Sequence, residues 1–91
     1  MLIAKVIGTV VATRKHEHLT GSKIQIVQPL APQTELPQGD PFVAVDAVGA
    51  GVGEVVIVVR GSGARQAVDN PNCPVDATII GIIDQMDIEE S

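Results

Sequence analysis

Apolar stretches rich in valine and isoleucine alternate along the chain with stretches of glycine, proline and charged residues. Valine and isoleucine are β-branched and favour the pleated surface of a sheet. The apolar stretches therefore predict strands, separated by turns and loops. The five expected strands cover residues 2–12, 22–28, 42–48, 54–60 and 78–84, the last extending at most to residue 88.

Residues 22–28 show the clearest alternation of side-chain type. The two isoleucines, Ile24 and Ile26, fall on one face of an extended chain. The other face holds Lys23, Gln25 and Val27. A period of two is typical of a strand with one buried face, so we expect a half-buried strand here.

Glycine and proline set the boundaries between the strands. Residues 29–41 contain four prolines, so we expect no regular structure there. The glycines of residues 49–53 predict a tight turn, and Gly8 indicates a bend or bulge within the first strand. Residues 62–67 are expected to form one short helical turn that Ser62 caps.

The connections are too short for a parallel βαβ fold. A parallel crossover needs a dozen or more residues, usually helical, and no stretch of the chain predicts such a helix. With 91 residues the chain is long enough for one domain, residues 1–91. We therefore expect an all-β fold, a small five-stranded antiparallel barrel of the OB-like kind with one short helical turn.

Two of the expected strands are apolar on both faces. Residues 55–59 and 79–83 contain only aliphatic residues and one glycine. A barrel has one interior, so the outward side chains of these strands need another cover. A second copy of the chain would supply that cover, so we expect a homo-oligomer. The alternative is that the short helical turn and the long loops cover these faces.

Charge and composition exclude several classes of function. Six Lys and Arg residues stand against eleven Asp and Glu residues, and Phe42 is the only aromatic residue. Nucleic-acid binding needs cations for phosphates and usually aromatic rings for bases, so we expect none. No apolar run is long enough to span a membrane, and the N-terminus does not resemble a secretory signal. The single cysteine, Cys73, allows no disulfide within the chain, so we expect the protein to be cytoplasmic.

The two glycine-containing motifs have more than one interpretation. Residues 49–53 lack the GxGxxG spacing of a dinucleotide site, and a strand rather than a helix follows them. They favour a turn that needs positive φ or a close backbone approach, as at a crowded symmetry axis. Residues 61–65 offer backbone amides and Arg65 to an anion, but they also fit a capped turn whose arginine pairs with a carboxylate.

No constellation of residues predicts catalysis. His16 and His18 have no third ligand nearby, so they do not predict a metal site. Asp46, Asp76 and Asp84 stand at strand edges without an adjacent nucleophile or histidine. We expect them to act in caps, turns or intersubunit ion pairs. We therefore predict no catalytic residue, no metal and no cofactor.

Several short motifs follow one another along nearly the whole chain. They are Val6–Thr13, Leu19–Gly21, Val27–Pro29, Ala44–Asp46, Val48–Glu54, Gly61–Arg65, Pro74–Ala77 and Ile80–Asp84. Each motif is weak alone, but their order and spacing together resemble the EutN/CcmL family of bacterial microcompartment vertex proteins. The insert of residues 33–40 and the short tail after Asp87 look more like the members from catabolic, propanediol-type compartments than those from carboxysomes.

The resemblance implies a structural protein rather than an enzyme. Members of this family form cyclic homopentamers that occupy the fivefold vertices of polyhedral protein shells, beside hexameric shell proteins. The implied location is the microcompartment shell in the cytoplasm. A ring-forming accessory protein of the cochaperonin kind is the alternative, although residues 13–21 and 29–41 lack the apolar tripeptide of its mobile loop.

The resemblance also places the family's glycine-containing motifs on numbered positions of this chain. The GAGxGE motif falls on residues 49–54, the GSxAR motif on residues 61–65 and the PVD motif on residues 74–76. It implies that eight residues lie near subunit contacts or the central axis. These are Gly49, Ala50, Gly51, Gly53, Glu54, Ser62, Arg65 and Asp76.

Overall fold

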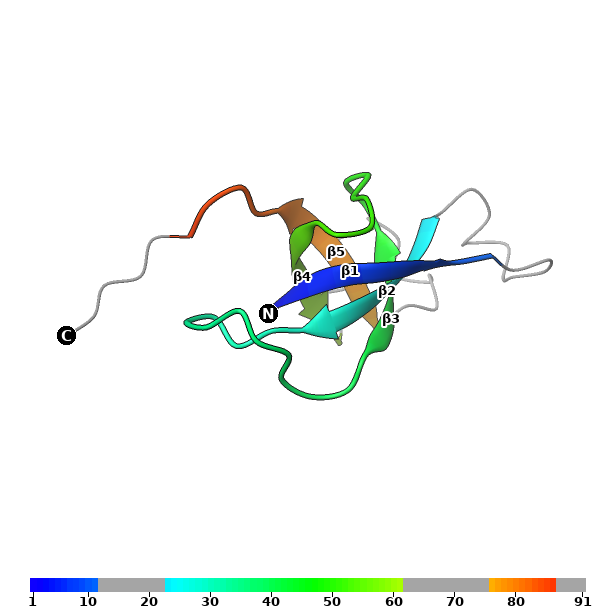
Figure 1. The fold of residues 1–91 in the computed structure, drawn as a ribbon. Coiled ribbons are helices and arrows are strands. Elements are labelled where there is room, and N and C mark those ends of the chain that lie inside the picture. The colour runs from blue at the N-terminus through cyan, green and yellow to red at the C-terminus, as the bar shows by residue number, and fades with distance from the viewer. Residues whose placement is uncertain (12–22, 62–75, 87–91) are drawn as a thin grey trace.

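The computed structural model describes residues 1–11, 23–61 and 76–86, and the strands in these segments close into a barrel (Figure 1). The expected helical turn over residues 62–67 lies outside the described residues. Each of the five expected strands is confirmed, with ends that shift by one or two residues in most cases. The strands are β1 (Leu2–Val10), β2 (Lys23–Pro29), β3 (Phe42–Asp46), β4 (Val55–Arg60) and β5 (Ala77–Ile82).

The order of strands around the barrel is β1-β2-β3-β5-β4, and it closes from β4 back to β1. Four of the five pairs are antiparallel, but β3 and β5 run parallel, with Val45 beside Thr78 and Asp46 beside Ile79. The expected five-stranded barrel is therefore confirmed, and the antiparallel arrangement expected of it holds at every pair except this one. The reason is geometric, because an odd number of strands in a closed ring cannot alternate direction throughout.

Two irregularities in strand register bend the sheet. In the β1–β2 pair the register shifts between Val6 and Gly8, which confirms the bulge expected at Gly8. In the β4–β5 pair Ile57 lies opposite Gly81 and Val58 opposite Ile79, so one residue of β5 is extra. Bulges increase local twist and bend a strand, as closing a small barrel requires.

The interior of the barrel is filled by short aliphatic side chains. Val6, Val56, Val58 and Ile79 are fully buried there, and Phe42 packs against the cluster while remaining partly exposed. A five-stranded barrel is narrow, and small side chains such as valine and alanine suit its interior. The core contains, in chain order, Ala4, Val6, Val27, Ala44, Ala50, Val56, Val58, Ala77 and Ile79.

The alternation expected along β2 is present, but the isoleucines are not on its buried face. Gln25 and Val27 are fully buried, whereas Ile24 and Ile26 are only partly buried on the outer surface. Pairing sets this parity, because Val27 lies opposite the buried Val6 of β1. A one-residue change of register would reverse the two faces. The polar Gln25 therefore points into the barrel.

The outer surface of the barrel is apolar over several strands. Ile57 and Val59 of β4 are only partly buried, while Ile7 of β1 and Val43 of β3 are 47% and 51% exposed. Among the described residues, these side chains retain access to solvent in the single chain. This pattern agrees with the two-sided character expected of β4.

Candidate subunit-contact loop

The loop between β3 and β4, residues 47–54, is organised by the carboxylate of Asp46. This loop is drawn in bright green at the top of Figure 1. The Oδ1 atom accepts hydrogen bonds from the backbone amides of Val48 and Gly49, both at 2.9 Å. The Oδ2 atom accepts one from the amide of Ala50 at 2.7 Å. An aspartate at the start of a turn commonly satisfies the next amides in this way, so Asp46 has the turn role expected of it.

The side chain of Gln25 holds the same loop from inside the barrel. Its Nε2 atom donates to the carbonyl oxygen of Ala50 at 2.7 Å and to Oδ2 of Asp46 at 3.3 Å. Its Oε1 atom accepts a hydrogen bond from the Thr9 hydroxyl at 2.7 Å. Lys23 Nζ also donates to the Ala50 carbonyl, at 3.1 Å. Side chains of β2 and β3 therefore hold Ala50 directly, and Thr9 of β1 holds Gln25 in place.

The far end of the loop is bound to β1 and to its own backbone. Gly53 N donates to the carbonyl oxygen of Val6 at 2.8 Å, and Val6 N donates to the carbonyl oxygen of Glu54 at 3.0 Å. The Glu54 carboxylate accepts a hydrogen bond from Gly51 N at 2.6 Å. Gly49 and Gly53 have φ angles of 79° and 96°. These values confirm that the turn needs positive φ, which glycine adopts at least cost.

The side chains of the loop divide into buried and exposed groups. The Ala50 methyl group belongs to the barrel core and is fully buried. In contrast, Val48 is 41% exposed and Val52 is 64% exposed. The loop is therefore anchored by polar contacts and by one core residue, while two aliphatic side chains remain in contact with solvent.

The structure gathers five of the eight sequence-predicted site residues in this loop, namely Gly49, Ala50, Gly51, Gly53 and Glu54. Asp76 is exposed directly before β5, where its carbonyl oxygen accepts a hydrogen bond from Gly61 N at 2.8 Å. Ser62 and Arg65 lie outside the described residues.

Sequence reasoning did not predict the part that Gln25 plays in holding the loop. The available signal was a polar residue sharing a strand face with Val27 in a barrel lined largely by aliphatic side chains.

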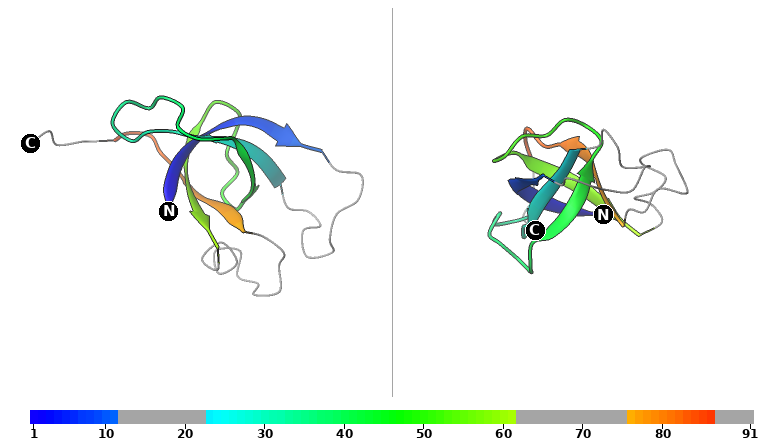
Figure 2. Two further views of the ribbon diagram at one scale, coloured as in Figure 1. Left: turned by 90° about the horizontal axis from the view of Figure 1, so that it is seen from below. Right: turned by 90° about the vertical axis from the view of Figure 1, so that its right-hand side faces the viewer.

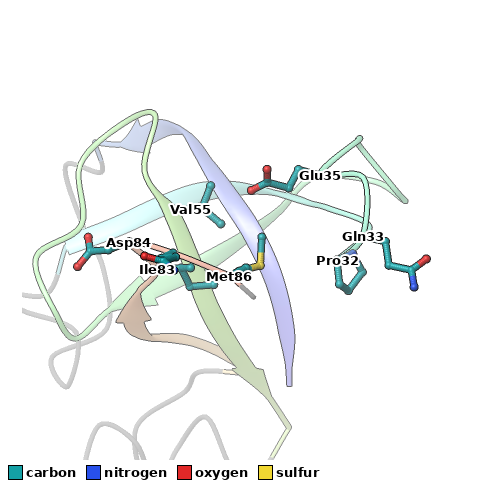
Figure 3. Close-up of a pocket in the computed structure, with 8 residues that line it drawn as sticks. Pro32, Gln33, Glu35, Val55, Ile83, Asp84 and Met86 are labelled. Atoms are coloured by element: carbon teal, nitrogen blue, oxygen red, sulfur yellow. The ribbon is translucent and has the colours of Figure 1, made fainter. Parts of the chain in front are cut away.

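A second surface feature lies at the end of the barrel where β1 begins, the end from which residues 30–41 project (Figure 2). An open hollow of about 510 Å³ separates that segment from residues 83–86 (Figure 3). Its two carboxylates, Glu35 and Asp84, are drawn on opposite sides of Val55 in Figure 3. The hollow is lined by Pro32, Gln33, Glu35, Val55, Ile83, Asp84, Gln85 and Met86.

An apolar hollow of about 350 Å³ adjoins the first one and shares Pro32 and Ile83 with it. It is lined by Met1, Leu2, Ile3, Pro32, Ile57 and Ile83. Its lining offers aliphatic contact and no side chain suited to proton transfer or nucleophilic attack. The hollow therefore extends the apolar outer surface of β4.

The described residues show neither a metal-binding cluster nor a membrane span. No group of three His, Cys, Asp or Glu side chains among residues 1–11, 23–61 and 76–86 is placed to hold a metal ion. Within the same ranges, no helix is long and apolar enough to cross a membrane.

A barrel with an anchored glycine loop and an apolar exterior is the framework of a known family. The family model described as "Ethanolamine utilisation protein EutN/carboxysome" matches residues 1–84. The chain belongs to this EutN/CcmL family, as the order of its motifs indicated.

Relatives from two kinds of shell match the chain over most of its length. The bacterial microcompartment shell vertex protein GrpN of Rhodospirillum rubrum is 46% identical over 87 residues, which cover 96% of this chain and 97% of GrpN. The carboxysome shell vertex protein CcmL of Synechocystis sp. is 47% identical over 92 residues, covering 97% of this chain and 87% of CcmL.

Solved structures share the fold as well as the sequence. The ethanolamine utilization protein EutN superposes with a TM-score of 0.92 at 42% identity, covering 97% of this chain and 91% of EutN. A GrpN structure from R. rubrum, whose title calls it a pentameric microcompartment shell protein, has a TM-score of 0.86 at 45% identity. That match covers 98% of this chain and all of GrpN. The five-stranded barrel is therefore the barrel of this family.

Proposed function

We propose that this protein is a shell vertex protein of a bacterial microcompartment, and that five copies form a ring that caps a fivefold vertex. The observation that carries the proposal is family membership over residues 1–84. The named relatives are shell vertex proteins, and GrpN is described as a pentameric shell protein.

The surface of the barrel supports assembly into a ring. A cyclic ring joins different surfaces of neighbouring copies, so each chain needs two distinct contact areas. One apolar area surrounds Ile57 and the adjoining hollow at the start of β1. Another includes Val43 of β3, which lies opposite Ile26 on the outer surface. Burial in subunit contacts would remove both areas from water.

The loop of residues 47–54 is our candidate for part of the subunit contact or the central axis. Its support is the combination of fixed backbone geometry with the exposed side chains of Val48 and Val52. From their positions in the family motifs, we propose that Ser62, Arg65 and Asp76 contribute to the same contacts.

The proposed role is structural, with hexameric shell proteins as neighbours. Flat sheets of hexamers need fivefold points to close into a polyhedron, and a ring of five copies supplies such a point. We also propose a catabolic compartment rather than a carboxysome. The support is the insert of residues 33–40, which looks more like that of the catabolic members of the family.

Two measurements, made one after the other, test the proposal. Native mass spectrometry of the purified protein at micromolar concentration should show a pentamer, and a dominant monomer or hexamer would refute the ring. Deletion of the gene in a strain that keeps its hexameric shell proteins should then give elongated or open shells by electron microscopy. Normally closed polyhedra, in a strain without a second vertex gene, would refute the vertex role.

A further inference from the structure

Gln25 is a fully buried polar residue in a barrel otherwise lined largely by aliphatic side chains. Burying an amide is costly unless its donors and acceptor are all used. Among the described residues no buried polar side-chain atom lacks a partner, and Gln25 makes three hydrogen bonds. Two acceptors face its Nε2 and one donor faces its Oε1, so the network itself sets the orientation of the amide.

The hydrogen bonds of Gln25 converge on the part of the loop that carries the exposed valines. Ala50 is held on both sides of its backbone, with its amide on Asp46 and its carbonyl on Gln25 and Lys23. Val48 and Val52 flank this anchored residue and remain exposed. Many hydrogen bonds thus fix the loop backbone, while Val48 and Val52 stay exposed to water. Such a loop is suited to bind another molecule without first changing its conformation.

We infer that Gln25 is a positioning residue for ring assembly. Its amide holds the loop so that Val48 and Val52 meet the adjacent copy of the chain in one geometry. The inference rests on the proposed ring. It adds that Gln25 fixes the loop in the conformation that contacts the adjacent copy. A loop already fixed in the free chain loses less conformational freedom on association, which strengthens binding without adding a contact.

The substitution Gln25→Glu tests the donor without changing the shape of the side chain. It replaces the Nε2 donor with an oxygen that faces two other oxygens, the Ala50 carbonyl and Asp46 Oδ2. Burial and the Asp46 carboxylate both raise the pKa of the introduced carboxyl. The Lys23 ammonium, which donates to the same Ala50 carbonyl at 3.1 Å, opposes this shift, and we expect burial and the Asp46 carboxylate together to outweigh it. Near pH 5.5 we therefore expect the introduced carboxyl to be protonated and to donate to the loop again.

The readout is the protein concentration at which half of the rings dissociate, measured by sedimentation velocity over a dilution series. Relative to the unmodified chain at the same pH, we expect Gln25→Glu to raise this concentration by about tenfold at pH 8. At pH 5.5 we expect the difference to fall to about threefold or less. A change that is independent of pH would overturn the inference, because a packing defect does not respond to protonation.

Gln28→Glu is the matched control on the same strand. Gln28 also donates through Nε2, to the carbonyl oxygens of Pro29 and Gly39 at 3.0 Å each, but it is only partly buried and does not contact the loop. Its substitution should leave ring dissociation unchanged at both pH values. If Gln25→Glu and Gln28→Glu behave alike, Gln25 does not position the contact.

Gln25→Met separates positioning from folding if the charged variant does not fold at pH 8. Methionine fills a similar volume, the Ala50 carbonyl keeps its bond from Lys23 and Asp46 Oδ2 keeps its bond from the Ala50 amide, so the urea midpoint of the dissociated chain should fall only slightly. The ring should still dissociate at a concentration about tenfold higher than that of the unmodified chain. Unchanged dissociation would overturn the inference and leave the proposed ring intact, whereas an unmodified chain that forms no pentamer would overturn the proposed function itself.

Discussion

Alanine substitution at the three glycines of the loop should give three different losses of stability. At Gly49 and Gly53 an added Cβ would meet no atom within 4 Å, so any cost arises from φ angles of 79° and 96°. Side chains disfavour this region by about 1–2 kcal/mol at the left-handed helical minimum. We expect a loss of about 1–2 kcal/mol for Gly49→Ala.

Gly53→Ala should cost more than Gly49→Ala. Its φ of 96° lies further from the left-handed helical value, and its amide is tied to the Val6 carbonyl at 2.8 Å, which restrains relaxation. We expect a loss of about 2–3 kcal/mol. Gly51 has no positive φ, and an added Cβ would lie 3.3 Å from Glu54 Oε1 at the end of a flexible side chain. Gly51→Ala should therefore stay within about 0.5 kcal/mol of the unmodified chain.

The assay is urea unfolding followed by far-ultraviolet circular dichroism. Ring formation contributes to apparent stability, so each variant is compared at two protein concentrations, one of them below ring dissociation. The order of losses should be Gly53→Ala, then Gly49→Ala, then Gly51→Ala. Equal losses at all three positions, or the largest loss at Gly51, would refute the argument from backbone geometry.

Three other substitutions probe the core, the barrel end and the outer surface. Val56→Ala removes two methyl groups from a fully buried site and should cost about 2 kcal/mol in urea unfolding; a loss below about 0.5 kcal/mol would contradict the packing described. Arg60 lies 4.6 Å from the centre of the Phe42 ring, so Arg60→Met should cost about 0.5–1 kcal/mol, whereas no loss in the same assay would show that the contact is not stabilising. Ile57→Lys should leave circular dichroism unchanged and reduce the pentamer fraction in native mass spectrometry; a full pentamer would exclude this surface from the ring contact.

Strand positions were predictable from the sequence, but the direction of each side chain was less so. Runs of valine and isoleucine locate all five strands, because these residues fit a pleated surface wherever it lies. The buried face of β2 follows instead from its pairing with β1, which places Val27 against Val6. When the exterior is apolar too, hydrophobicity cannot distinguish the inside from the outside. For this reason the outward direction of Ile24 and Ile26 could not be predicted from the sequence.

The candidate loop was predictable in part. Glycine spacing indicated a turn with positive φ, and Gly49 and Gly53 have it. The buried amide of Gln25 was not foreseen, because its partners on β1 and in the loop are 16 and 25 residues away in the sequence. Only the closed barrel brings them together. That one neighbouring pair must be parallel was implicit in the strand count, since five strands cannot alternate around a closed ring, but the count does not tell that this pair is β3–β5.

The parallel pair of β3 and β5 also bears on when, during synthesis of the chain, the loop of residues 47–54 becomes fully supported. Asp46 pairs with Ile79 of β5, and the following residue, Ala47, donates to the Ile79 carbonyl at 3.2 Å. The loop that Asp46 organises therefore starts from a strand whose free edge β5 must cover. Because β5 follows the other four described strands in the chain, it leaves the ribosome after them, and until then the edge of β3 is open and the loop is incompletely supported. In the proposed ring, we therefore expect completed chains to associate and chains that still lack β5 to associate poorly.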